Sequence, residues 1–239
     1  MLHIVLGVVA LILAWFLLPF ALRKRGEARL EARCRAARAI VLSYDDGPSS
    51  GLTPRLLDLL GETGAKATFF LLGRNTETRE AIVARALAEG HEIGSHTFDH
   101  SNAWKTQPLR AARDLARGIA TVARLGGDAR LYRPPYGKLT LATWVQCHLR
   151  AQRLGWWTVD SKDTEDGPDR RRIDDILAQL DTRGGGVVLA HDFDRADDAT
   201  NPDSHADYVV DLTRRVISFA REKDYRILPL RDLPQAGTA

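Results

Sequence analysis

Short apolar runs alternate with longer amphipathic segments along this chain, and that alternation restricts its possible folds more than any other feature. The apolar runs, which we expect to be strands, are 39–44, 66–72, 91–95, 129–133, 155–160, 186–191 and 225–230. Between them, apolar residues recur at the helical spacing, as at Leu109, Ala112, Leu115, Ile119 and Val122. Strand–helix repetition of this kind predicts a parallel sheet with crossover helices. Seven such strands predict an α/β fold, a distorted or incomplete (β/α)7 barrel.

The N-terminal segment is strongly apolar. Residues 1–22 contain no Asp, Glu, Lys or Arg, and residues 4–18 are apolar throughout. A helix of about 20 residues rises about 30 Å, which matches the hydrocarbon core of a bilayer. We therefore expect a single-pass transmembrane helix at 1–22. The alternative is a cleaved signal peptide, but the segment lacks the positively charged start and the small-residue cleavage site of such peptides.

A basic segment, 23–38, follows the predicted anchor. Its basic residues are Arg23, Lys24, Arg25, Arg29, Arg33, Arg35 and Arg38. Positive charge on this flank predicts that the following domain is cytoplasmic, with an extracytoplasmic domain as the alternative, and that the linker contacts anionic lipid. The remaining domain, 39–239, is slightly acidic, which argues against nucleic acid as the main partner.

Five short polar strings carry side chains that bind metals or transfer protons, and each follows or ends a predicted strand. The strings are Asp45-Asp46-Gly47, His96-Thr97-Phe98-Asp99-His100, Arg133-Pro134-Pro135-Tyr136-Gly137, Asp160-Ser161-Lys162-Asp163 and Leu189-Ala190-His191. In barrels of this type the active site forms at the C-terminal ends of the strands. We therefore expect the five strings to converge on one mouth.

His96 and His100 are four residues apart, so on a helical turn both imidazoles would face one side. Alone, such a pair is more typical of a solvated surface. Together with Asp46 it forms a set of two nitrogens and one oxygen that leaves coordination positions open. This composition predicts one divalent metal, with zinc favoured and cobalt, nickel, manganese or iron also compatible.

The order of the strings and their neighbours resembles the NodB-type polysaccharide deacetylases (carbohydrate esterase family 4), metal-dependent amide hydrolases that act on N-acetylated sugars. The resemblance covers about residues 39–232, and the runs 90–96 and 133–137 are its most specific parts. The first string departs mildly from the family's usual Thr-Phe-Asp-Asp-Gly, because Ser43 and Tyr44 replace Thr and Phe. The resemblance implies a NodB-type barrel and a catalytic domain spanning 39–239.

The resemblance also implies chemical roles. Asp45 corresponds to the general base and His191 to the general acid. The metal ligands correspond to Asp46, His96 and His100. The other histidines, which match nothing in the family pattern and which we expect to be structural or solvated, are His3, His91, His148 and His205.

Supporting roles follow from the same resemblance. Arg133 is expected to orient Asp45, Tyr136 to offer its backbone N–H to the oxyanion, and Asp163 to pair with His191 and favour its protonated form. The expected substrate pocket consists of Trp157, Leu189, Pro134 and Thr164. Many family members have Trp where this chain has Thr164, so we expect a more open pocket wall here.

We therefore expect a hydrolase that removes N-acetyl groups from an amino-sugar-containing polysaccharide, oligosaccharide or lipid-linked glycan. One alternative is a deformylase or another amidase acting on a polyprenyl-linked sugar. An alternative outside the enzymes is a membrane-tethered carbohydrate-binding protein with an inactive site. The enzyme is favoured because candidate ligands, base and acid are all present in the sequence.

Overall fold

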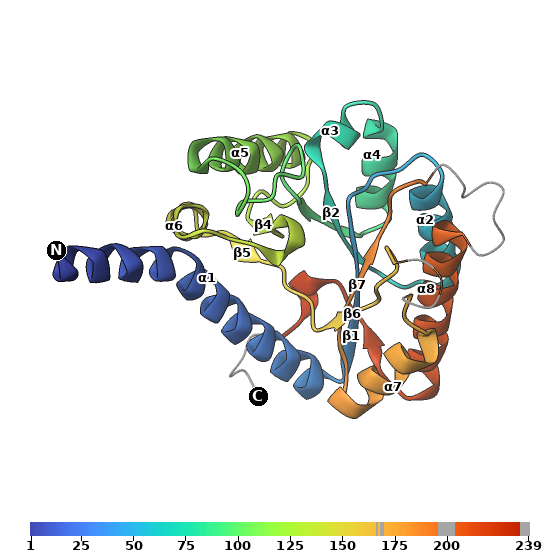
Figure 1. The fold of residues 1–239 in the computed structure, drawn as a ribbon. Helices are drawn as coiled ribbons and strands as arrows, with labels where there is room; N and C mark the ends of the chain where they lie inside the picture. Colours follow the sequence, from blue (N-terminus) through green and yellow to red (C-terminus); the bar gives the residue numbers. More distant parts are fainter. Residues whose placement is uncertain (166, 168–169, 196–203, 235–239) are drawn as a thin grey trace.

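Eight parallel strands form one open, barrel-like sheet (Figure 1). The computed structural model describes residues 1–165, 167, 170–195 and 204–234. The strands are β1 (Ala39–Asp45), β2 (Thr68–Leu71), β3 (Glu92–Ser95), β4 (Leu131–Tyr132), β5 (Arg153–Leu154), β6 (Val159–Asp160), β7 (Gly186–His191) and β8 (Arg226–Ile227). Their order is β5-β4-β3-β2-β1-β7-β6, and β8 pairs with β1. Because the order ends at β5 on one side and β6 on the other, the sheet is a half-barrel.

Helices cover the sheet (Figure 1). They are α1 (Leu2–Ala37), α2 (Leu52–Thr63), α3 (Gly73–Thr76), α4 (Glu80–Ala88), α5 (Pro108–Arg124), α6 (Leu141–Leu149), α7 (Ile173–Arg183) and α8 (His205–Glu222), with short 3-10 turns at η1 (Pro135–Gly137) and η3 (Leu230–Asp232). α5 begins at Pro108, where a missing N–H costs nothing, and buries Leu115, Ile119 and Val122 on one face. The helical spacing predicted these three positions together with Ala112, which is half-buried, and Leu109, which is exposed.

The central strand β1 separates two apolar cores. All of its residues are buried, and successive side chains of a strand point to opposite faces. Leu42 and Tyr44 belong to the core that includes α2 and α8. Ala39 and Val41 belong to the core that includes α1. By the same alternation, Asp45 lies on the face that carries Val41.

The parallel half-barrel confirms the predicted α/β fold, with one difference among the strands. The predicted strand 155–160 is reduced to β6, and the separate strand β5 precedes it. The carbonyls of Gly155 and Trp156 accept hydrogen bonds from the Arg133 guanidinium, at 2.7 and 3.3 Å, instead of continuing the strand. Because β5 is an additional strand, the sheet has eight strands where the sequence predicted seven.

The N-terminal helix differs from its prediction. α1 runs without interruption from Leu2 to Ala37, and its N-terminal end extends beyond the domain (Figure 1). Leu30 and Cys34 are buried in the core beneath it. Nearer the N-terminus, the Phe16 ring meets the Trp104 ring edge-on, with centroids 5.4 Å apart.

The predicted transmembrane helix at 1–22 and the membrane-anchored location derived from it are therefore wrong. Within the described ranges, no helix combines the length and the apolar character that crossing a bilayer requires. The apolar stretch is the first part of a longer helix that continues into charged residues, and Phe16 and the buried Pro19 contact the domain itself.

Candidate active site

The five strings predicted to converge do so at the C-terminal edge of the sheet. Asp45 ends β1 and lies beside His191, which ends β7, in the parallel register. His96 and Arg133 directly follow β3 and β4, and these two strands are neighbours. The structure thus places carboxylate, imidazole and guanidinium groups from distant parts of the sequence at one edge.

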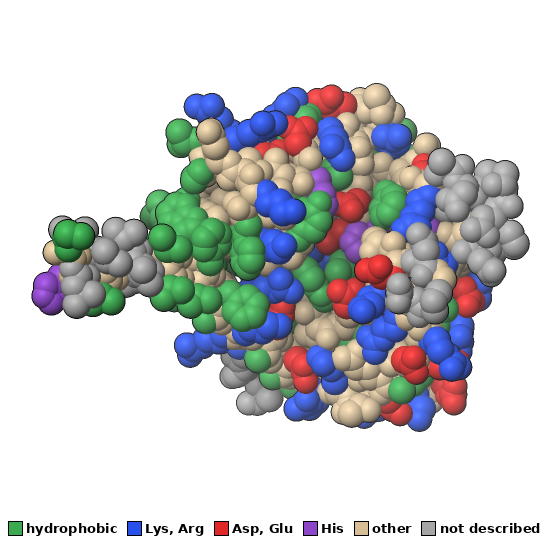
Figure 2. Space-filling model, viewed as in Figure 1, with side chains coloured by type: hydrophobic (Ala, Val, Ile, Leu, Met, Phe, Trp, Pro, Cys, Tyr) green, Lys and Arg blue, Asp and Glu red, His purple; other side chains and the backbone are tan. Residues whose placement is uncertain are grey.

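A cavity of about 550 Å³ opens at this edge. Its lining residues are Asp45, Asp46, His96, His100, Tyr136, Lys138, Trp157, Asp160, Lys162, Thr164, Glu165, Leu189, His191 and Phe193. Figure 2 shows histidine and acidic side chains together near the centre of this face, with Lys and Arg side chains around them. The cavity is the candidate active site.

Asp46, His96 and His100 form a compact group that fits a metal ion. Each offers one ligand atom, and these atoms all lie within 4.8 Å of one another. Asp46 Oδ1 is 3.3 Å from His100 Nε2 and 3.6 Å from His96 Nε2. This oxygen is enclosed and has no hydrogen-bond partner among the residues that the structure describes. A buried carboxylate oxygen without a donor is costly, and a bound cation would satisfy it.

The environment of His96 prepares it as a ligand. Its Nδ1 lies 2.8 Å from the carbonyl oxygen of Arg133. A proton on Nδ1 makes this a hydrogen bond and leaves the lone pair of Nε2 facing Asp46 and His100. Burial lowers the pKa of His96 to about 3, although the negative charge of Asp46 acts to raise it. The imidazole is therefore neutral, as metal binding requires.

The segment from His96 to His100 is a loop, not the helical turn that the spacing suggested. Thr97 and His100 adopt left-handed backbone angles, with φ of 69° and 63°. Asp114 on α5 holds the loop, because its carboxylate accepts hydrogen bonds from the N–H groups of Phe98 and Asp99 at 3.1 and 2.7 Å. The two imidazoles are therefore brought together by loop geometry.

Asp45 is held by a fully buried arginine. Arg133 Nη1 donates to Asp45 Oδ1 at 2.7 Å, and Nη2 donates to Ser43 Oγ at 3.0 Å. The guanidinium also lies over the Phe70 ring, 4.0 Å from its centroid. Burial raises the pKa of the Asp45 carboxyl above its ordinary value, and the charges of Arg133 and His191 offset this only in part. Asp45 is thus a fixed carboxylate with increased basicity.

His191, which is half-buried, belongs to a chain of two histidines and one buried carboxylate. Asp163 Oδ1 is 3.0 Å from His191 Nδ1, and Asp163 Oδ2 is 3.0 Å from His205 Nε2. Burial lowers the pKa of His191, but the charge and hydrogen bond of Asp163 outweigh it and raise the pKa to about 10. Burial would raise the pKa of the Asp163 carboxyl, yet the two histidines hold it well below its usual range.

Sequence reasoning missed His205, which was expected to be structural or solvated. It is the first residue of α8 and is buried against Phe193, with ring centroids 4.5 Å apart. No sequence spacing relates it to Asp163, from which it is separated by α7 and β7. Only the packing of α8 beside the strand ends reveals the contact.

The expected pocket residues are largely brought together. Trp157, Thr164 and Leu189 line the cavity, whereas Pro134 is buried and is not among the lining residues. Tyr136 stands at the mouth with 54% of its side chain exposed. Its backbone φ is 58°, and its ring lies 4.7 Å from the His100 ring. The additional lining residues, which the sequence did not single out, are Lys138, Asp160, Lys162, Glu165 and Phe193.

The chain is similar in sequence to known polysaccharide deacetylases. The profile of the polysaccharide deacetylase family matches residues 32–152. The peptidoglycan-N-acetylglucosamine deacetylase of Bacillus cereus is 30% identical over 199 residues, which make up 83% of this chain and 69% of that protein. The chitooligosaccharide deacetylase of Sinorhizobium fredii is 31% identical over 211 residues, covering 83% of this chain and 92% of that protein.

The fold is similar as well. A crystal structure of a peptidoglycan N-acetylglucosamine deacetylase superimposes with a TM-score of 0.71 at 29% identity, over 84% of this chain and 90% of that one. The likeness extends over most of both chains, so the predicted NodB-type barrel is confirmed for the domain that contains the candidate site.

Proposed function

The chain belongs to the NodB-type polysaccharide deacetylases, carbohydrate esterase family 4, and from this premise we propose the reaction that it catalyses. We infer that it hydrolyses the N-acetyl amide of a glycan containing N-acetylglucosamine, with the help of one bound divalent metal ion. Relatives named for peptidoglycan and chitooligosaccharides support this substrate class. The observation that carries the proposal is the placement of Asp45 and His191 in one cavity with the candidate metal ligands.

The metal would be held by Asp46, His96 and His100. When bound, a divalent ion supplies Lewis acidity for the amide carbonyl and makes water nucleophilic near neutral pH. Two neutral imidazoles and one carboxylate suit zinc best, and cobalt, nickel, manganese and iron remain compatible with the same set. The enclosed, unpartnered Asp46 Oδ1 supports this assignment.

Asp45 is proposed as the general base. As the attacking water forms a bond to the amide carbon, Asp45 accepts its proton. Arg133 holds one carboxylate oxygen at 2.7 Å, which fixes the direction of the other. That second oxygen, Oδ2, lies 3.6 Å from His96 Nε2, close to the candidate metal site. Base catalysis of this kind contributes about 10²–10⁴-fold to a rate.

His191 is proposed as the general acid. Its pKa of about 10 keeps the imidazole protonated at neutral pH, so that it can donate a proton to the departing amine. Breaking the C–N bond then yields acetate and a free amino sugar. We assign the backbone N–H of Tyr136 to the developing oxyanion, a type of contact typically worth several kcal/mol. Asp163 would hold His191 in its protonated form.

Acetate release tests the proposal directly. Purified protein is incubated with chitooligosaccharides and with peptidoglycan glycan strands, with and without a chelator, and acetate is measured by an enzyme-coupled assay. We expect acetate release that is lost with chelator and restored by Zn²⁺. Release of formate from an N-formylated sugar, without acetate from the acetylated one, would instead favour the deformylase alternative. Metal-loaded protein that releases neither acid would contradict an amidase function.

A further inference from the structure

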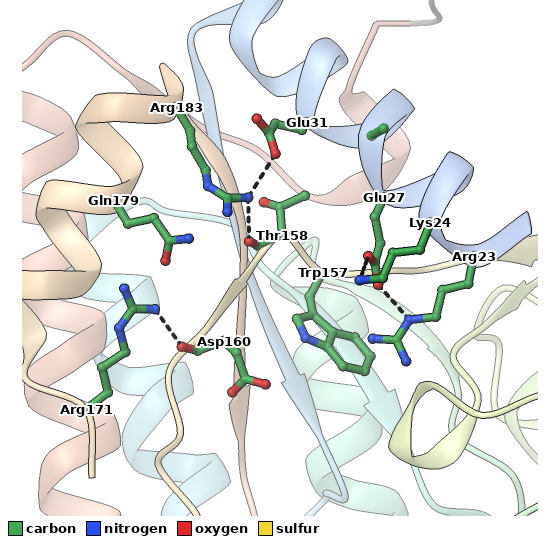
Figure 3. A pocket seen from close by; sticks show the side chains of 11 residues that line it. Arg23, Lys24, Glu27, Glu31, Trp157, Thr158, Asp160, Arg171, Gln179 and Arg183 are labelled. Carbon is green, nitrogen blue, oxygen red and sulfur yellow. Dashed lines mark hydrogen bonds and ion pairs between the residues drawn. The ribbon is translucent and has the colours of Figure 1, made fainter. Parts of the chain in front are cut away.

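A second cavity, of about 430 Å³, lies beside the candidate active site between α1 and α7 (Figure 3). Its lining residues are Arg23, Lys24, Glu27, Ala28, Glu31, Trp157, Thr158, Asp160, Arg171, Gln179 and Arg183. Trp157 and Asp160 also line the candidate active site, so the two cavities adjoin at these two residues. A ligand that extends past them from the candidate active site would reach the second cavity.

The charged groups of this α1–α7 cavity already have partners. Arg183 donates to Glu31 at 2.8 Å and to the Thr158 carbonyl at 2.9 Å. Arg171 donates to the carbonyl oxygen of Asp160 at 2.9 Å. Figure 3 shows these pairs along the walls of the cavity.

The remaining cations of the α1–α7 cavity are paired as well. Arg23 and Lys24 both donate to Glu27, at 2.6 and 2.8 Å. The lining also carries the carboxylates Glu27, Glu31 and Asp160, which would repel a phosphate or another anion. The chemistry therefore disfavours an anionic ligand.

The polar groups suit a neutral ligand with many hydroxyls. Gln179 Oε1 is enclosed and has no hydrogen-bond partner within the described part of the chain. Such an oxygen needs a donor, and Figure 3 shows the Gln179 amide extending into the cavity opposite Trp157. Carboxylates, guanidinium groups and an amide offer acceptors and donors side by side, while the indole offers an apolar face. Sugar units have this combination of hydroxyl edges and apolar ring faces.

Arg23 links the two cavities. Its guanidinium lies over the Trp157 ring, 4.6 Å from the centroid, and donates to the Gly137 carbonyl at 2.8 Å. Gly137 follows Tyr136 in the turn at the mouth of the candidate active site. The helix α1 therefore lines the α1–α7 cavity and also contacts the turn beside the candidate active site.

We propose that the α1–α7 cavity binds the sugar units adjacent to the unit being deacetylated, so that α1 forms one wall of an extended glycan groove. The proposal rests on the proposed function, because it assigns neighbouring units of the same substrate. It predicts that affinity for an N-acetylglucosamine oligomer rises with its length and that blocking the cavity removes this increase.

Filling the cavity from α1 tests the proposal. Ala28 is an exposed residue of α1 on the cavity wall, so Ala28→Trp places a large ring there without removing a hydrogen bond. Ala36→Trp is the matched control, because Ala36 is exposed on the same helix and does not line the cavity. Gln179→Leu, on the opposite wall, removes the amide and provides a second variant.

Binding of the dimer and the hexamer of N-acetylglucosamine is measured by calorimetry with the full chain, with a chelator present to prevent hydrolysis. We expect the wild type and Ala36→Trp to bind the hexamer at least tenfold more tightly than the dimer. In Ala28→Trp this ratio should fall below about threefold, and Gln179→Leu should lower it in the same direction. Circular dichroism confirms that each variant is folded.

Equal binding of the two oligomers by the wild type, or an unchanged ratio in both cavity variants, would overturn the proposal. Acetate release is assayed in parallel to separate this outcome from failure of the proposed function. Deacetylation of the oligomers without a length-dependent effect of Ala28→Trp would leave the function intact and remove the groove. Length-dependent binding that Ala28→Trp abolishes, without acetate release, would support the groove and contradict the catalytic assignment.

Discussion

At the strand ends, single side chains hold the carboxylate and the imidazole that we propose as base and acid. Arg133 binds Asp45, and Asp163 binds His191, so each of the two groups has a buried partner of opposite charge. Both pKa values are raised, but for different reasons: burial dominates at Asp45, and the charge of Asp163 outweighs burial at His191. Each partner favours the charged form of its group, so a carboxylate and an imidazolium can coexist in one cavity.

Replacing Asp45 with Asn tests the base. The amide is nearly isosteric but cannot accept a proton from water, so we expect turnover to fall by about 10²–10⁴-fold. Metal content, measured by atomic absorption, should stay near the wild-type value. Asp99→Asn is a suitable control, because Asp99 is an exposed residue in the loop between the two candidate histidine ligands. Wild-type turnover in Asp45→Asn would contradict the assignment.

Replacing Asp163 with Asn tests the acid through pH dependence. The Asp163 carboxylate raises the pKa of His191 to about 10, so removing its charge lowers that pKa. In the proposed mechanism the rate requires protonated His191, and the alkaline limb of the rate–pH profile should therefore move to lower pH. A hydrogen bond to a charged group contributes about 1.5–3 kcal/mol, and one pKa unit is about 1.36 kcal/mol, so we expect a shift of at least about one unit.

The same pair predicts how stability varies with pH. The pKa of His191 is raised on folding, so its contribution is fully present below about 6.5, the unfolded value, and is lost as pH rises toward 10. The pKa of Asp163 is lowered, so its contribution to stability is lost in acid.

If the alkaline limb of the rate–pH profile stays in place in Asp163→Asn, a group other than His191 sets it.

At the scale of elements, the position of α5 determines the shape of the loop that carries His96 and His100. A Cβ added at Gly118 on α5 would lie 2.3 Å from a backbone atom of Thr97, so only glycine allows this close approach. Asp114, one helical turn earlier, anchors the same loop through backbone N–H groups. Helix and loop therefore form one unit.

We expect Gly118→Ala to displace the loop and weaken metal binding by at least tenfold in a Zn²⁺ titration. Gly61→Ala is the control, because Gly61 is also helical and a Cβ there meets nothing within 4 Å. In an open helical position, Ala stabilises by up to about 1 kcal/mol relative to Gly. Unchanged Zn²⁺ affinity in Gly118→Ala would show that the loop does not depend on this contact.

The sequence predicted the repeating strands and helices. It did not predict the local structures that depend on contacts between distant segments. Strand-end strings located Asp45, His96, Arg133 and His191 correctly, because parallel strands place their C-terminal ends together. The spacing argument correctly predicted that His100 lies near His96, but it predicted a helical turn where the structure has a loop. The left-handed backbone of this loop and its hydrogen bonds to Asp114 cannot be predicted from residue spacing.

Two further differences between prediction and structure also come from long-range packing. The apolar residues at 1–22 suggested an anchor, but a local apolar run does not reveal that they begin a longer helix whose Phe16 packs against Trp104, far away in the sequence. His205 was missed because its contact with Asp163 depends on where α8 begins relative to the strand ends. Both are contacts between segments that no local pattern connects.

For the molecule as a whole, the candidate metal site connects the central strand to its neighbours. Asp46 follows β1, and His96 and His100 follow β3, so a bound ion would link two strands that are separated by β2. Metal binding to the folded state alone must raise the unfolding temperature. This effect does not depend on turnover, so it tests the site independently of the substrate.

With Zn²⁺ at about 100 times its dissociation constant, the stabilisation is about 2.7 kcal/mol. For a chain of this size, about 1 kcal/mol shifts Tm by about 2–4 °C, so we expect an increase of about 5–11 °C by calorimetry. The double variant His96→Ala, His100→Ala should lose this increase, whereas a variant at the buried but remote His91 should retain it. His91 is a suitable comparison because it lies before β3, away from the cavity. An equal Zn²⁺-dependent shift in the double variant would place the metal elsewhere, because a single carboxylate at Asp46 cannot hold the ion with comparable affinity.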